Sequence, residues 1–134
     1  MSHPEVPFWE AVDALRARDP RYRREAYGFV VAALAASVSE LPLERRNDPG
    51  RRHLSGAELV LGVVRLARRE FGDLSEVVFR EWNVTRSEDI GRIVFELVEC
   101  GQLSARPEDR LQDFLEAPEF LGLLAAGARA PAGG

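Results

Sequence analysis

The chain has 134 residues, of which 46% are hydrophobic and 30% charged, a composition typical of one folded domain with a sizeable core. Its single cysteine excludes an internal disulfide, and its net charge of −4 gives no general attraction to nucleic acid. The longest uncharged run, residues 26–39, is too short to cross a bilayer, and the amino-terminal stretch lacks the basic and apolar regions of a secretion signal. We therefore expect a cytoplasmic protein without membrane contact.

Apolar periodicity predicts two helices at the start of the chain. Residues 7–18 carry one apolar stripe at helical spacing, formed by Phe8, Val12 and Leu15. Asp19 suits an N-cap and Pro20 suits a first helical position, so a second helix is expected over residues 20–40. Residues 43–52 have turn composition and are expected to form a loop.

A capping box predicts where the central helix begins. Ser55 and Glu58 are three residues apart, so each side chain can accept a hydrogen bond from the backbone N–H of the other residue. A helix is therefore expected from this point to about Glu70. The helix is apolar on most sides and should lie at the centre of the domain. Glycine within a helix costs about 1 kcal/mol relative to alanine, so Gly28 and Gly62 indicate close helix–helix approach.

The second half of the chain predicts four further helices. Residues 74–82 follow Asp73 as a cap, and residues 87–100 follow a second capping box formed by Thr85 and Glu88, with Gly101 as the stop. Two short helices are expected at about 107–116 and 118–126.

The expected fold class is therefore all-α, a compact bundle of about six to seven helices in one domain. The domain should span residues 1–126, with a disordered tail over 127–134. Two finer features are left open: a two-stranded ribbon pairing 51–54 with 102–105, and the winged-helix-like core that such a ribbon would complete.

Four separated blocks resemble an uncharacterised family of small bacterial proteins. They are RDPRYRREAYGFV (18–30), RRHLSGAEL (51–59), FREWNV (79–84) and EDIGRIVFELVECG (88–101). The resemblance covers about residues 6–114, whereas the carboxy-terminal part departs from the family pattern. It implies a bacterial protein of unassigned activity and brings no catalytic residues.

The stretch from Glu81 to Ser104 has the outline of a helix-turn-helix, but the charge of the second helix argues against DNA recognition. With its apolar positions facing the core, the outward set is Asp89, Arg92, Glu96 and Glu99. Segment 86–100 carries two arginines and four acids, which would repel phosphate. We interpret this helix as structural.

The strongest basic signal lies between residues 44 and 69, which carry seven arginines and three acids. The candidate anion- or partner-binding patch consists of Arg45, Arg46, Arg51, Arg52, Arg65 and Arg69. The alternative interpretation is a solvated loop whose arginines pair with nearby acids. Residues 1–70 carry a net charge of +2 and residues 71–134 one of −6. We expect at least two arginines among Arg21, Arg23, Arg24, Arg65, Arg68 and Arg69 to pair with acids beyond residue 70.

Catalysis and metal binding find little support in the sequence. His53 has no metal-ligand spacing, and Cys100 lies at a helix carboxy-terminus, where the helix dipole disfavours a thiolate. The prediction is therefore no enzyme, no cofactor and no metal. The expected function is a protein–protein interaction module that is a monomer or weak homodimer with an unknown protein partner. Nucleic-acid binding through the 45–69 patch, or through a winged-helix-like core, is the alternative.

Overall fold

The structure, a computed structural model, describes residues 6–48, 54–104 and 119–128, and within these ranges the chain is all-α. Its elements in chain order are α1 (Phe8–Arg18), α2 (Arg24–Ser39), α3 (Leu43–Arg46), α4 (Gly56–Phe71), the 3₁₀ turn η1 (Gly72–Leu74), α5 (Ser75–Glu81), α6 (Ser87–Glu99) and α8 (Phe120–Ala128). The predicted fold class is confirmed for these residues.

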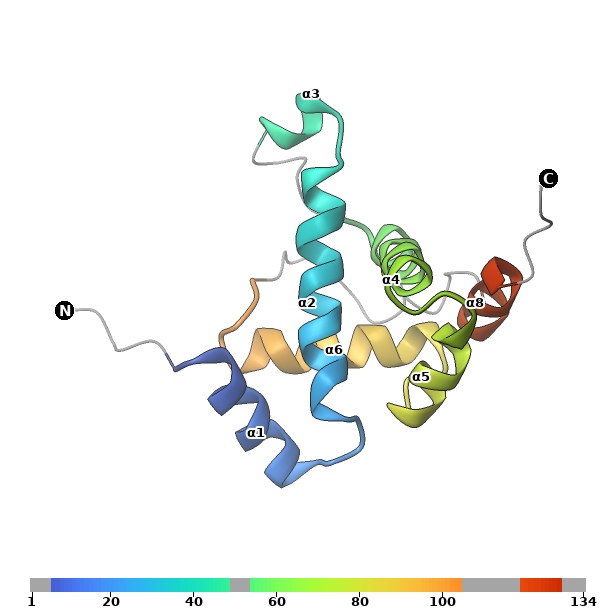
Figure 1. The fold of residues 1–134 in the computed structure, drawn as a ribbon. Helices are drawn as coiled ribbons and strands as arrows, with labels where there is room; N and C mark the ends of the chain where they lie inside the picture. Colours follow the sequence, from blue (N-terminus) through green and yellow to red (C-terminus); the bar gives the residue numbers. More distant parts are fainter. Residues whose placement is uncertain (1–5, 49–53, 105–118, 129–134) are drawn as a thin grey trace.

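Helices α2 and α6 cross at the centre of the fold. In Figure 1, α6 runs behind α2, α1 lies on one side of the crossing, and α4, α5 and α8 lie on the other. Helix α2 packs against α1, α4 and α6, and α8 packs against α4, η1 and α5. Helix α3 projects at the far end of α2, away from the crossing (Figure 1).

Aromatic rings fix the corner between α4 and α5. Five of them form one cluster with neighbouring centroids 5.0–5.8 Å apart: Phe29, Phe71, Phe79, Trp82 and Phe120. Edge-to-face and tilted ring pairs of this kind stabilise a core beyond the area that they bury. Because the rings come from α2, α4, α5 and α8, they hold these elements in one arrangement.

The two helical glycines make room for different neighbours. A Cβ atom at Gly62 would collide with the Oγ of Ser37 on α2 and lie 3.3 Å from its Cβ, so the predicted close helix–helix approach is confirmed there. At Gly28, a Cβ atom would lie only 2.6 Å from Cη2 of Trp9. That glycine accommodates an indole side chain from α1 rather than a helix backbone.

Several predicted boundaries were wrong. Helix α2 begins at Arg24 rather than Pro20, and the Asp19 carboxylate accepts a hydrogen bond from the Arg21 N–H at 3.2 Å in the linker before it. The expected loop after Pro42 contains helix α3. The helix expected from residue 74 begins at Ser75, after η1.

The remaining predictions fall partly outside the described residues. Of the expected ribbon, Leu54 and residues 102–104 lie in no strand, and 51–53 and 105 lie outside the described ranges. The helix expected over 107–116 also lies outside them. Helix α8 extends to Ala128, so residues 127 and 128 belong to a helix and not to the expected tail, whose other residues are not described.

Candidate functional site

Arg45, the first residue of the predicted basic patch, is part of a clamp at the start of α4. Its guanidinium lies 2.7 Å and 3.3 Å from the two carboxylate oxygens of Glu58, a bidentate pair. The same carboxylate accepts the Ser55 N–H at 2.8 Å, and the Glu58 N–H donates to the Ser55 hydroxyl at 3.0 Å, so the predicted capping box is confirmed. The Arg45 hydrogen bond is the main cause that lowers the pKa of Glu58. Arg45 therefore has a structural role.

Three further arginines gather at the carboxy-terminal end of α2. Arg46 donates to the Ser39 carbonyl oxygen at 3.1 Å, and Arg65 and Arg69 lie 3.9 Å and 4.0 Å from the Glu40 carboxylate. Helix α2 has no basic residue in its own last turn, so cations from α3 and α4 complement the negative end of its dipole. Arg51 and Arg52 lie outside the described residues, and the predicted patch of six arginines is not brought together as one described surface.

The end of α4 nevertheless carries a distinct basic depression. It has a volume of about 460 Å³ and is lined by Arg65, Arg68, Arg69, Gly72 and Asp73. Among the described residues, none forms an ion pair or hydrogen bond with the Arg68 guanidinium. The sequence-based patch omitted Arg68, although its spacing from Arg65 places both on one face of a helix.

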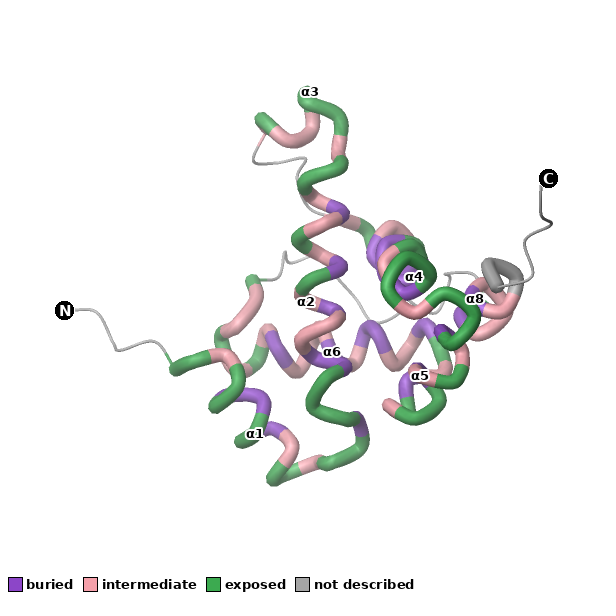
Figure 2. Tube along the Cα trace, in the orientation of Figure 1, coloured by how far each residue is buried: buried purple, intermediate pink, exposed green. Residues whose placement is uncertain are grey.

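Exposed apolar side chains accompany this depression along the chain. Leu61 lies one helical turn before Arg65, Leu74 follows Asp73 directly, and Val77 lies one turn further on. Leu74 and Val77 are 63% and 62% exposed. Figure 2 shows that η1 and most of the last turn of α4 are exposed, whereas α5 mixes exposed and buried residues. We define the α4–α5 face as Leu61, Arg65, Arg68, Arg69, Leu74 and Val77.

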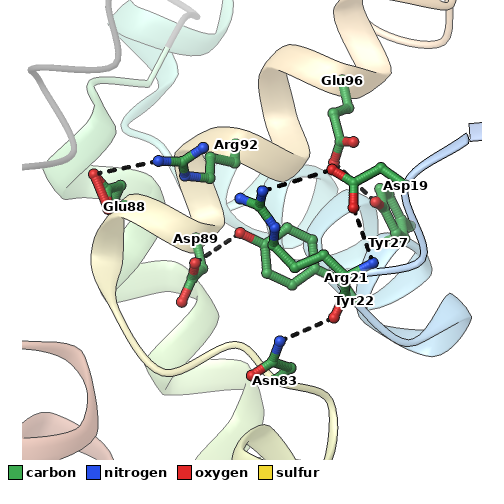
Figure 3. Close-up of polar contacts among 9 residues, drawn as sticks. All are labelled: Asp19, Arg21, Tyr22, Tyr27, Asn83, Glu88, Asp89, Arg92 and Glu96. Carbon is green, nitrogen blue, oxygen red and sulfur yellow. Dashed lines mark hydrogen bonds and ion pairs between the residues drawn. The ribbon is translucent and has the colours of Figure 1, made fainter. Parts of the chain in front are cut away.

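The second helix of the proposed helix-turn-helix is not an exposed recognition helix. Ile90, Ile93 and Leu97 of α6 are fully buried. Asp89 and Glu96, which the sequence placed on the outward face, are half-buried acceptors of hydrogen bonds from tyrosines (Figure 3). That outward-face assignment was therefore wrong for both acids.

Two tyrosine–carboxylate pairs attach α6 to the first part of the chain. The Tyr22 hydroxyl donates to Asp89 at 2.6 Å, and the Tyr27 hydroxyl donates to Glu96 at 2.8 Å. Burial is the main cause that raises the pKa of both phenols, and burial also raises the pKa of Glu96 against the opposing effect of its Tyr27 hydrogen bond. The pairs act as internal fasteners, because the buried phenols are held in their protonated, donating form.

Asp89, and not the predicted Glu88, makes the capping hydrogen bonds at the start of α6. Its second oxygen accepts the Thr85 and Arg86 N–H groups, both at 3.0 Å. The capping box expected from Thr85 and Glu88 was therefore wrong by one residue. The Glu88 carboxylate instead lies 3.8 Å from both Arg86 and Arg92.

The linker before α2 is attached to the turn before α6. Asn83, in a left-handed conformation with φ of 64°, donates from its side-chain amide to the Arg21 carbonyl at 3.0 Å. Arg23 donates its N–H to the Trp82 carbonyl at 3.3 Å and pairs with Glu81 at 3.0 Å. Of the expected pairs between the basic and acidic halves, Arg23–Glu81 is the one that the described residues show.

The remaining features concern metal ligands, the lone cysteine and the length of the helices. Among residues 6–48, 54–104 and 119–128, no group of three or more His, Cys, Asp or Glu side chains is placed to hold a metal ion. The Cys100 thiol is half-buried and donates to the Leu97 carbonyl at 3.5 Å, and His53 is outside the described residues. Within the same ranges, no helix combines the length and apolar character needed to cross a membrane.

Comparisons of this chain with protein families, with curated proteins and with solved structures find no match. The α4–α5 face is accordingly judged by its own chemistry. It combines guanidinium groups with exposed aliphatic side chains, and it lies on a corner that the aromatic cluster fixes from beneath.

Proposed function

We propose that this protein is a non-catalytic protein-interaction module of the bacterial cytoplasm, a monomer or weak homodimer that contacts its partner through the α4–α5 face. The observation that carries the proposal is the depression that Arg68, which has no described partner, lines together with Asp73, the residue before the exposed Leu74. The resemblance to small bacterial proteins and the lone cysteine support the cellular setting.

The chemistry of the face supports a protein contact. Large aliphatic side chains more than 60% exposed leave apolar surface in water, and contiguous surface of this kind marks interaction sites. Arginine is enriched in protein interfaces because its stem packs against apolar groups while its planar head forms several hydrogen bonds. The face offers both parts of such an interface on neighbouring elements.

Nucleic-acid binding is the competing function, and the arginines of the depression are the observation in its favour. It is weakened by two features of the described residues. Arg45 is neutralised by Glu58. Helix α6 carries Asp89 and Glu96, which accept hydrogen bonds from tyrosines, where a DNA-recognition helix would carry basic side chains. A winged-helix-like mode would also need a wing, and the described residues 54 and 102–104 supply no strand.

The test is affinity capture from a bacterial lysate with three baits: the wild type, Arg68→Glu and Arg18→Glu. Arg18 is the matched control, because it is exposed and lies in the last turn of α1 as Arg68 lies in the last turn of α4. Both substitutions therefore carry the same helix-dipole cost. We expect a protein that the wild type and Arg18→Glu capture and that Arg68→Glu loses. An identical captured set for all three baits would refute a role of this face.

A further inference from the structure

We infer that the α4–α5 face receives an acidic amphipathic helix of a protein partner, which inserts a carboxylate between the arginines and lays an apolar side chain on Leu74 and Val77. This inference rests on the proposed function and specifies the chemistry of the partner. Charge complementarity and the placement of the depression's apolar neighbours support it.

The charge of the depression favours a carboxylate. The depression has three guanidinium groups, from Arg65, Arg68 and Arg69. They outnumber the two carboxylates beside them, which are Asp73 in the lining and Glu40 next to Arg65 and Arg69. The Glu40 oxygens are 3.9 Å and 4.0 Å from the arginines, beyond the 2.7–3.2 Å range typical of N–H···O hydrogen bonds. Arg65 and Arg69 are also 57% and 60% exposed. Their planar donors are therefore available to an incoming carboxylate, which they can hold in bidentate geometry.

The same surface is poorly suited to a phosphate backbone. Residues 65–81 carry four arginines and four acids, so the local basic group at the depression does not continue as a basic track along the segment. A duplex needs several phosphates neutralised along its length, whereas a carboxylate side chain needs only one local group of donors.

The apolar residues specify the rest of the ligand. Leu74 and Val77 are three residues apart and both more than 60% exposed, so they offer adjacent apolar surface. A helix places an acidic and an apolar side chain on one face when they are three or four residues apart. Because Leu74 directly follows Asp73, which lines the depression, such a helix can reach the arginines and begin to cover the apolar surface of Leu74 and Val77. This is a recognition mode in which an amphipathic helix uses its apolar face as anchor.

The experiment uses the full chain and a fluorescein-labelled helical peptide of about 15 residues, long enough for about four turns. Glutamate and leucine alternate along one face of the peptide at spacings of three and four residues. A second peptide carries glutamine in place of each glutamate. Fluorescence anisotropy is measured for the wild type, Arg68→Glu, Leu74→Ser and the control Arg18→Glu, and circular dichroism melts verify that each variant is folded. A labelled DNA duplex is titrated in parallel over a salt series.

We expect the acidic peptide to bind the wild type and Arg18→Glu, with affinity lowered at least about tenfold by Arg68→Glu and by Leu74→Ser. The glutamine peptide should bind at least about tenfold more weakly than the acidic one. Equal affinity for both peptides, or equal affinity of wild type and Arg68→Glu, would overturn the inference. DNA binding that is stronger than peptide binding and sensitive to Arg68→Glu would also overturn it. If lysate capture depends on Arg68 while the acidic peptide fails to bind, the inference is wrong and the proposed interaction surface stands.

Discussion

Replacing Tyr27 by phenylalanine tests whether the tyrosine–carboxylate pairs hold the fold together. The substitution removes one hydroxyl from a ring that is 0% exposed, and with it the 2.8 Å hydrogen bond to Glu96. A hydrogen bond to a charged group contributes about 1.5–3 kcal/mol. Glu96 is only half-buried, so water screens and partly replaces the lost donor. We therefore expect the free energy of unfolding to fall by about 1–2 kcal/mol at neutral pH.

The loss should depend on pH in a defined direction. Burial raises the folded-state pKa of Glu96 above its ordinary value, so its contribution to stability is least favourable at neutral pH and improves as the pH falls through that raised pKa. The Tyr27 hydrogen bond opposes the rise, and its removal should raise the pKa of Glu96 further. The protonated carboxyl is cheaper to bury, so Tyr27→Phe should be less destabilising at about pH 5 than at about pH 7.

Urea denaturation at the two pH values measures both effects. A loss of 1–2 kcal/mol corresponds to a midpoint shift of roughly 0.5–1 M urea at a typical slope of about 2 kcal/mol/M. Tyr22→Phe is the matched comparison, because Asp89 keeps two backbone donors when it loses the phenol. We expect a smaller loss there at neutral pH. An equal loss from Tyr27→Phe at both pH values would refute the role assigned to Glu96.

Substitutions at four other positions test the packing, the caps and the strained turn. Gly62→Ala should lower the free energy of unfolding by about 1–2 kcal/mol, since its new Cβ would collide with Ser37 Oγ, and adding Ser37→Ala should restore most of the loss in chemical denaturation. Ser55→Ala should cost about 0.5–2 kcal/mol through loss of the cap, measured the same way. The lowered pKa of Glu58 adds stability that is present above its ordinary pKa and lost as the pH falls, so Glu58→Gln should flatten the acid limb of the stability profile; an unchanged limb would contradict this. Asn83→Ala should cost about 1–2 kcal/mol in left-handed strain, and Asn83→Gly should cost less in a thermal melt; the opposite order would contradict the strain argument.

Local signals in the sequence located the elements whose ends are fixed locally. The box of Ser55 and Glu58 placed the start of α4, and Gly101, with φ of 81°, ends α6 where it was expected. In both cases the hydrogen-bond partners lie within a few residues of each other. Such contacts are visible in a single sequence because spacing alone determines them.

The start of α2 was misplaced because distant contacts decide it. Asp19 and Pro20 favour a helix locally, but residues 19–23 lie in no helix and the chain bends at Tyr22. The Tyr22 carbonyl accepts a hydrogen bond from Arg16 at 2.8 Å, and its phenol reaches Asp89, which lies 67 residues away in the chain. These contacts satisfy the linker without helical hydrogen bonds. A signal in the sequence was the spacing of Asp89 and Glu96, which are two helical turns apart and therefore share one face of α6.

The candidate patch was misjudged because a net charge counted along the chain does not show which arginines lie on the same surface of the fold. Arg45 and Arg65 are close in a net-charge window, yet the first binds the start of α4 and the second lies near its end. The seven residue steps from Glu58 to Arg65 alone span about 10 Å of helix. Helical spacing from Arg65 would have selected Arg68, which charge counting alone did not distinguish.

The α4–α5 face is suited to binding because the elements that carry it are held rigidly from below. The Ser75 hydroxyl is fully buried and lies 2.7 Å from the Gly72 carbonyl oxygen and 3.0 Å from that of Ala67, so it closes the corner between α4 and α5. The aromatic cluster packs beneath the same corner. A partner therefore does not have to order the backbone on which Arg68 and Leu74 are displayed, and only the side chains lose freedom on binding. Substitutions at the buried Ser75 should therefore lower both stability and recognition. Arg68→Glu should abolish recognition while lowering stability no more than the control Arg18→Glu does.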